Sequence, residues 1–222
     1  MNQPAKPPII IETKENPQYA IIWLHGLGAN GHDFEPIVPE LGLDDFAIRF
    51  IFPNAPSRPV TVNGGYVMPA WYDIKGTDIA DKEDKQGMHQ SQSYLNDLVG
   101  LTIADGIKSE NIVIAGFSQG GAVATYSLIR MQHKLAGCLA LSTYVPFMSE
   151  SKNEFIDLNE ETPIFWGHGS LDDVVPESLG KQSANHLTEL GYPVEWHSYP
   201  MAHSVNAHEI TDISNWFKKV LK

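Results

Sequence analysis

Ser118 stands between two glycines in the segment Gly116-Phe-Ser-Gln-Gly120, with an apolar run before it and small residues after it. This order predicts a strand, a sharp turn and a helix, the arrangement called a nucleophile elbow. Both glycines are expected because a Cβ at either position would collide with the neighbouring backbone. The turn would raise the serine hydroxyl above the sheet edge, at a helix N-terminus that favours negative charge. The segment therefore predicts attack by Ser118 on an acyl carbon.

A nucleophilic serine needs a base, and the base needs an acid that orients it. In chains with this elbow they follow in the order serine, acid, histidine. An apolar strand at 163–167 ends in glycine, and Asp172 and Asp173 lie in the loop beyond it. A second strand, at 193–199, precedes a loop that contains His203. Because strand ends of an open parallel sheet converge on one edge, these loops can meet.

Two choices remain among these candidates. Asp172 is favoured as the acid because it stands nearer the strand end, whereas Asp173 could cap the helix expected near Pro176. Among nine histidines, His203 alone combines the required order with a loop at a strand end. His25 and His168 are expected at strand ends, where they shape turns or pack beneath the site. The remaining histidines are expected in a strand (His197), in helices (His89, His133, His186 and His208) or in a loop ahead of the serine (His32).

The elements that must position these residues alternate between strand and helix. Apolar or alternating runs predict strands near 18–24, 46–52, 111–116, 135–142, 163–167 and 193–199. Helices are expected near 33–42, 88–108, 119–133, 177–190 and 206–221. This alternation predicts an α/β protein with a mainly parallel sheet and helices on both faces. At 222 residues the chain is expected to form a single domain over 1–222 without a separate lid domain, with 1–16 as a peripheral N-terminal segment.

Several motifs, kept in order along the chain, resemble the phospholipase/carboxylesterase family of α/β-hydrolases, which includes the acyl-protein thioesterases. The matching segments are Trp23-Leu-His-Gly-Leu-Gly28, Pro53-Asn-Ala-Pro56, Pro59-Val-Thr-Val-Asn63, Met68-Pro-Ala-Trp-Tyr-Asp73, Gly116-Phe-Ser-Gln-Gly-Gly-Ala122, His168-Gly-Ser-Leu-Asp-Asp-Val-Val-Pro176 and Met201-Ala-His203. They span residues 19 to about 217. The resemblance implies an α/β-hydrolase fold with Ser118 as nucleophile, Asp172 as acid and His203 as base.

The resemblance also implies that the backbone N–H groups of Leu27 and Gln119 bind the oxyanion. The residues support this independently, since such donors come from the residue after the nucleophile and from a loop after an early strand. The glycine-rich segment His25-Gly-Leu-Gly-Ala-Asn-Gly31 follows the apolar strand Tyr19-Ala-Ile-Ile-Trp-Leu24, so its amides can turn toward one point. Taken without the elbow, the same segment is only a glycine-rich turn.

Residues 53–87 form a long irregular segment, and long ordered loops in compact domains are usually functional. The resemblance implies substrate contacts from the loop around Trp71. The apolar side chains expected to line the acyl-binding surface are Val62, Tyr66, Val67, Met68 and Trp71. The alternative is that these side chains form a small local core beneath the loop. The segment Asn63-Gly-Gly-Tyr66 departs from the family pattern, because its glycines loosen a loop that should flank the acyl pocket. The charged run at 78–85 is expected to be solvated.

The amino-acid composition limits the kinds of molecule that the protein is expected to bind. A formal net charge of −12 argues against nucleic acid and against electrostatic binding to anionic membranes. The single cysteine, Cys138, excludes an intrachain disulfide and is expected to be a buried thiol. The N-terminus lacks an apolar signal core, no run reaches membrane-span length, and Asn2 does not fit myristoylation, which predicts a cytoplasmic protein. No metal or cofactor is expected, since H-E-x-x-H and C-x-x-C motifs are absent from the sequence.

The predicted function is hydrolysis of carboxylic esters or thioesters of acyl chains through an acyl-enzyme, similar to that of acyl-protein thioesterases. Expected substrates are small acyl esters or thioesters and lipidated proteins, and a homodimer is left open. A general short-chain carboxylesterase or lysophospholipase is the alternative within enzymes. A hydrolase-fold binding protein without turnover is the alternative outside them. The Ser-Asp-His set argues against that last alternative, since binding alone needs no such set.

Overall fold

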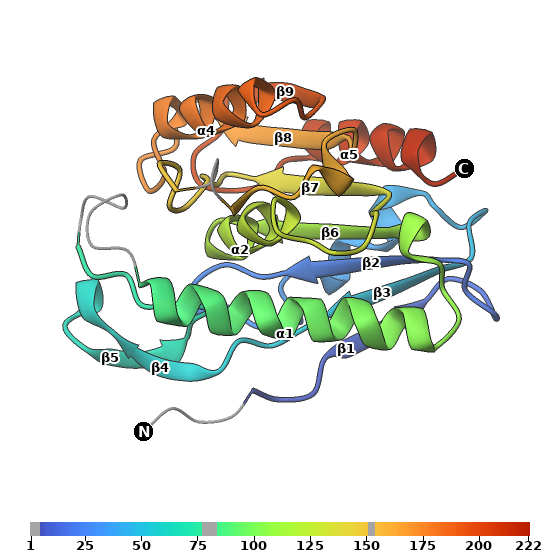
Figure 1. Cartoon of the computed structure of the whole chain (residues 1–222), viewed down its shortest axis with the longest axis horizontal. Helices are drawn as coiled ribbons and strands as arrows, with labels where there is room; N and C mark the ends of the chain where they lie inside the picture. The colour runs from blue at the N-terminus through green and yellow to red at the C-terminus, as the bar shows by residue number, and fades with distance from the viewer. Residues whose placement is uncertain (1–4, 77–83, 151–153) are drawn as a thin grey trace.

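A seven-stranded sheet forms the centre of the part of the protein that the computed structural model describes, residues 5–76, 84–150 and 154–222 (Figure 1). The strands follow the spatial order β1-β3-β2-β6-β7-β8-β9. β1 pairs with β3 in the antiparallel sense, and the other neighbours are parallel. The strands are β1 (Ile9–Glu12), β2 (Tyr19–Leu24), β3 (Ile48–Phe52), β6 (Ile112–Phe117), β7 (Gly137–Leu141), β8 (Ile164–Gly169) and β9 (Val194–Tyr199).

Helices pack on both faces of this sheet, as predicted. The helices α1 (Lys85–Ala104), α2 (Gln119–Leu128) and α4 (Glu177–Glu189) contribute to one apolar core. The helix α5 (Ala207–Val220) contributes to a second core on the opposite face. Figure 1 shows α1 and α2 in front of the strands in that view. None of the helices in the described ranges has the length and apolar character that crossing a bilayer requires.

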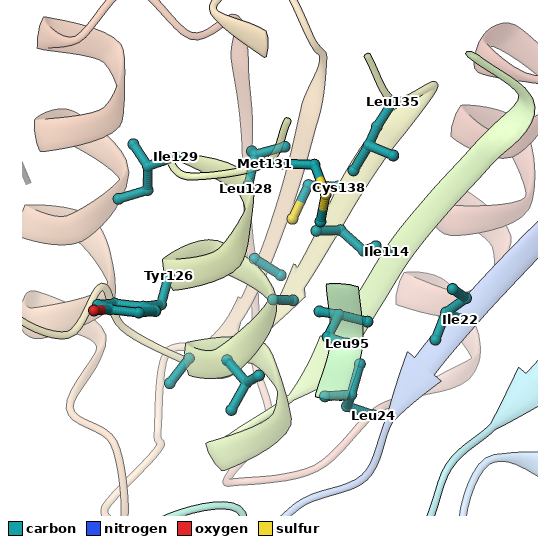
Figure 2. Packing of buried hydrophobic residues seen from close by; sticks show 14 of the residues in the cluster. Ile22, Leu24, Leu95, Ile114, Tyr126, Leu128, Ile129, Met131, Leu135 and Cys138 are labelled. Carbon is teal, nitrogen blue, oxygen red and sulfur yellow. The ribbon is translucent and has the colours of Figure 1, made fainter. Parts of the chain in front are cut away.

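The core on the α1/α2 face explains why the central strands are continuously apolar. Figure 2 shows side chains of α2 and of neighbouring strands meeting there, with the sulfurs of Met131 and Cys138 among them. Ile112 to Ala115 of β6 are fully buried, because a central parallel strand is covered on both sides. Cys138 is a free, buried thiol, as expected, and burial raises its pKa well above the usual range.

Three segments differ in kind from the sequence-based prediction, and the helix expected at 119–133 ends earlier, at Leu128. Residues 9–12, expected to be peripheral, form the edge strand β1, whose burial alternates along the strand. The helix expected at 33–42 is replaced by two short 3-10 helices, Glu35–Ile37 and Pro39–Leu41. Each has a proline in its first turn, and a proline inside a longer α-helix would remove a hydrogen bond and clash with the preceding turn.

The third difference lies in the long segment at 53–87. Here β4 (Ser57–Val60) and β5 (Tyr66–Pro69) form an antiparallel hairpin of their own. Gly64 and Gly65 at its turn have φ of 65° and 80°, the left-handed region that glycine enters without a penalty. These glycines therefore shape a defined turn and do not loosen the loop. Of the charged run expected to be solvated, 78–83 lie outside the described residues, and α1 begins at Lys85.

Candidate active site

Ser118 occupies the turn between β6 and α2, with φ 53° and ψ −119°. A left-handed φ is costly for a residue with a side chain, and it persists only where neighbours hold it. The Ser118 amide donates to the Leu141 carbonyl at 2.9 Å, and the Ser118 carbonyl accepts from the Thr143 hydroxyl at 2.7 Å. A Cβ on Gly116 would overlap the Gly120 backbone, so the expected reason for this glycine is confirmed.

Two backbone amides beside Ser118 donate no hydrogen bond to any described residue. One belongs to Leu27, in the loop after β2, and the other to Gln119, the first residue of α2, where a helix leaves its amides without intrahelical partners. The Leu27 loop is held by a bond from the Gly28 amide to the Pro69 carbonyl at 2.8 Å. Both residues line the same cavity as Ser118. The two amides are therefore free to bind an oxyanion formed at Ser118.

His203 lies against a buried carboxylate. Its Nδ1 is 2.7 Å from Oδ2 of Asp172, whose side chain has no exposed surface. The other oxygen, Oδ1, accepts from the amides of Val174 at 2.9 Å and Val175 at 2.8 Å. Burial alone would raise the pKa of Asp172, but the hydrogen bonds from His203 and these amides outweigh it and lower that pKa. Asp172 is thus a carboxylate at neutral pH, whereas Asp173 is exposed, and among the described residues His203 forms its hydrogen bond and ion pair with Asp172 and not with Asp173.

Two further histidines support the loops of the site. His25 is buried, and its Nε2 accepts from the Ala55 amide at 3.1 Å while Nδ1 donates to the Gly26 carbonyl at 2.7 Å. His168 is fully buried in β8, with Nε2 2.9 Å from the Val175 carbonyl. Burial lowers the pKa of both imidazoles against the opposing effect of these carbonyls, so both are neutral at pH 7. Both are buried at strand ends, His25 directly after β2 and His168 within β8 itself and not in a turn.

A cavity of about 310 Å³ joins the candidate residues. Ser118, His203, Leu27 and Gln119 line it, and Asp172 stands behind His203. The remaining wall is mainly apolar and aromatic, and it includes Tyr72, Ile74, Phe117, Tyr144, Val174 and Val175. None of these six residues was predicted to line the site. Tyr144, Val174 and Val175 could have been found from their positions after the ends of β7 and β8, because cavities of open α/β sheets lie outside the carboxyl ends of strands.

The structure places the five side chains expected on the acyl-binding surface outside this cavity, and two of them, Tyr66 and Val67, are exposed on the hairpin. Trp71 has 0% exposure, belongs to the core on the α1/α2 face, and donates its indole N–H to the His25 carbonyl at 2.8 Å. It is thus a core residue beneath the loop, the alternative that the sequence left open. Val62 is exposed on the hairpin, and Met68 is half-buried beside Gly28. The Trp71 amide still reaches the site indirectly, because it donates to Oε1 of Gln119 at 2.8 Å.

A mainly parallel sheet with a strained serine between a strand and a helix is the arrangement of an α/β-hydrolase. Within that class the chain belongs to the phospholipase/carboxylesterase family, whose model matches residues 5–221. It is therefore a carboxylic ester or thioester hydrolase, and the predicted family, fold and enzyme class are confirmed.

Similar proteins include curated relatives and solved structures. The chain is 38% identical to acyl-protein thioesterase 1 of Neurospora crassa, over 97% of this chain and 92% of that protein. It is 35% identical to acyl-protein thioesterase 1 of Cryptococcus neoformans, over 96% of both. Among structures, Arabidopsis thaliana SOBER1 superposes with a TM-score of 0.86 at 33% identity, covering 92% of this chain and 99% of that one. Zea mays acyl-protein thioesterase 2 gives 0.84 at 28% identity, covering 97% and 99%.

Proposed function

We propose that Ser118, His203 and Asp172 hydrolyse acyl esters or thioesters in two steps, through an acyl-enzyme. The observation that carries this assignment is the 2.7 Å contact between Asp172 and His203, in a cavity that His203 shares with Ser118. Because Nδ1 of His203 donates to the carboxylate, its Nε2 is left as the acceptor that takes the serine proton. Ser118 then attacks the acyl carbonyl.

The oxyanion of the tetrahedral intermediate is proposed to bind the amides of Leu27 and Gln119. Both amides line the cavity and donate to no described residue, so they need no rearrangement before reaction. One oxyanion donor of this kind is typically worth ~3–4 kcal/mol of transition-state stabilisation. His203 next protonates the alcohol or thiol leaving group, and water activated by His203 releases the acid. Asp172 stabilises the imidazolium in both steps.

The proposed substrates are acyl esters and thioesters, including acyl chains on proteins. The relatives named acyl-protein thioesterases support the protein-linked chains. A cytoplasmic location is part of this proposal, and the buried free thiol of Cys138 is compatible with it. A homodimer is left open.

A short-chain carboxylesterase or lysophospholipase is the second candidate. The observation in its favour is the size of the cavity, because about 310 Å³ is at the low end of the ~300–1,000 Å³ range of ligand pockets. A relative in Oryza sativa, 34% identical over 91% of this chain and 77% of that protein, is named a probable carboxylesterase. Hydrolysis rates for matched esters and thioesters of increasing acyl length separate the two candidates.

Covalent labelling tests the nucleophile directly. A fluorophosphonate probe should label the wild-type protein once, and Ser118→Ala should abolish both labelling and ester hydrolysis while the protein stays folded. Ser170→Ala is the matched control, because Ser170 is exposed just beyond β8 and does not line the cavity. Turnover above a few per cent in clean Ser118→Ala protein contradicts the mechanism, and an unlabelled wild type supports a binding protein without turnover.

A further inference from the structure

Asp33 places a carboxylate in the wall of the catalytic cavity. The residue lies between β2 and the short helix Glu35–Ile37, and it lines the same cavity as Ser118 and His203. Partial burial raises the pKa of Asp33, and no neighbouring charge or hydrogen bond opposes that rise. Among the described residues, none forms a hydrogen bond or an ion pair with this carboxylate. Its oxygens are therefore available to a molecule bound in the cavity.

The other charged groups near this wall have partners of their own. Asp172 has no exposed side-chain surface and forms its hydrogen bond with His203. His32, next to Asp33 in the chain, is exposed, and its Nδ1 lies 2.6 Å from the Glu35 carboxylate. No lysine or arginine of the described ranges lines the cavity. A substrate in the cavity consequently meets the negative charge of Asp33 with no cationic lysine or arginine in the wall to neutralise it.

Asp33 lies on the side of the cavity where the base stands. It directly precedes Phe34, whose ring centroid is 5.7 Å from that of Phe117. The ring of Phe117 in turn lies 4.7 Å from the ring of His203. Phe34 and Phe117 pack in the core on the α5 face of the sheet, whereas Tyr144 of the cavity wall belongs to the core on the α1/α2 face. The carboxylate and the imidazole therefore flank a bound substrate on the same side.

The leaving group must lie on that side as well. In the proposed mechanism His203 protonates the oxygen or sulfur of the leaving group, so this atom has to come within hydrogen-bond distance of the imidazole. The rest of the alcohol or thiol then extends along the wall that contains Asp33. Treated as a sphere, a cavity of about 310 Å³ is about 8 Å across, close to the Debye length at physiological ionic strength. The charge of Asp33 consequently acts on a leaving group held at His203.

We propose that Asp33 selects leaving groups that carry a positive charge. This inference rests on the proposed function, since it assigns a substrate class, esters and thioesters of cationic alcohols and thiols, to the same site. A quaternary ammonium group or a lysine side chain near the scissile bond gains Coulomb attraction from the carboxylate. An anionic leaving group is repelled by the same charge.

The test compares butyrylthiocholine with the neutral thioester of the same shape, in which a tert-butyl group replaces the trimethylammonium group. The measured quantity is the ratio of kcat/KM for the cationic thioester to that for the neutral one. Asp33→Asn should lower this ratio about twofold to fivefold, the range of a solvent-exposed ion pair. Comparing the ratio between two proteins cancels the intrinsic difference in reactivity between the two thioesters.

Glu35→Gln is the matched control, because it removes the same charge two residues away from a side chain that does not line the cavity. It should keep the wild-type ratio. Added sodium chloride should lower the ratio of the wild type toward that of Asp33→Asn, because salt screens an exposed charge. A thioester with a carboxylate in place of the ammonium group should show the reverse effect, with kcat/KM relative to the neutral thioester higher in Asp33→Asn than in the wild type.

A pair of S-butyrylcysteine peptides, with lysine or norleucine after the cysteine, tests the source of the cation. If Asp33→Asn lowers the preference for the lysine peptide too, the cationic class includes acylated proteins; if it lowers the thiocholine preference alone, the class is that of small esters. Equal thiocholine ratios in the wild type and Asp33→Asn overturn the proposal, and so does an equal fall in Glu35→Gln. In both of these cases a fluorophosphonate still labels Ser118, whereas failure of the proposed function would remove the labelling itself.

Discussion

Asp172→Asn should inactivate the enzyme without disturbing its fold. Oδ1 of Asp172 accepts two backbone amides, from Val174 and Val175, and these donors require an oxygen. The new side chain must therefore keep its oxygen there and turn its NH₂ group toward Nδ1 of His203, where Oδ2 now lies at 2.7 Å. Two donors cannot share a hydrogen bond, so the imidazole shifts its proton to Nε2 and loses the lone pair that accepts the serine proton.

The size of the loss follows from this change of tautomer. The same substitution in a serine protease triad lowers kcat about 10⁴-fold, and at 1.36 kcal/mol per factor of ten this is ~5.4 kcal/mol. We expect a loss of similar order in kcat for a short-chain ester, with the melting temperature close to that of the wild type. Steady-state kinetics and circular dichroism on the same preparations provide both quantities.

Asp173→Asn is the control for this experiment. Asp173 is exposed and adjacent in the chain, so its substitution changes the local charge equally without touching His203. Its kcat should stay within about twofold of the wild type, since surface changes away from a site have small effects. Equal losses in the two variants, or a larger loss for Asp173→Asn, would show that the wrong carboxylate has been assigned.

Three further predictions concern stability, each measured by chemical or thermal unfolding. Gly120→Ala should prevent folding or strongly destabilise the protein, because the added Cβ would overlap the carbonyl of Leu24. Gly100→Ala in α1 is the control, since its Cβ would meet no atom, and it should stabilise the protein by about 0.4–1 kcal/mol. Similar effects of the two substitutions would contradict this explanation. Trp71→Ala should cost about 3–5 kcal/mol, since the indole is fully buried, and a change below 1 kcal/mol would refute that role. Burial raises the pKa of Glu209 from 4.5 to about 8, so the native state holds a proton that the unfolded state releases. Stability should fall as pH rises from about 4.5 to about 8, and Glu209→Gln should remove this fall; an unchanged profile would contradict it.

The proposed nucleophile and its proposed partners could be located in the sequence because their chemistry constrains short segments. Gly116 and Gly120 are needed locally, and Asp172 and His203 each follow a strand whose end is marked in the sequence. The fold followed from the same strands, since long apolar runs report burial on two sides.

Contacts between distant residues could not be predicted in this way. Trp71 looks like a surface residue in a loop, and only the packing of α1 and of the His25 loop around it decides that it is buried. The contact of Tyr72 with Tyr144 joins two segments that carry no shared motif. Short elements could not be predicted from the sequence either, because the four residues of β1 form a strand only through pairing with β3.

Hydrogen bonds connect the β4–β5 hairpin with the two segments whose amides are proposed to bind the oxyanion. The Gly28 amide, next to Leu27, bonds to Pro69 at the end of β5, and the side chain of Gln119 bonds to the Trp71 amide two residues further on. The position of the hairpin and the affinity of the site for the tetrahedral intermediate are therefore thermodynamically linked. By reciprocity, whatever favours this hairpin position strengthens oxyanion binding, and a transition-state analogue bound at Ser118 must in turn stiffen the hairpin.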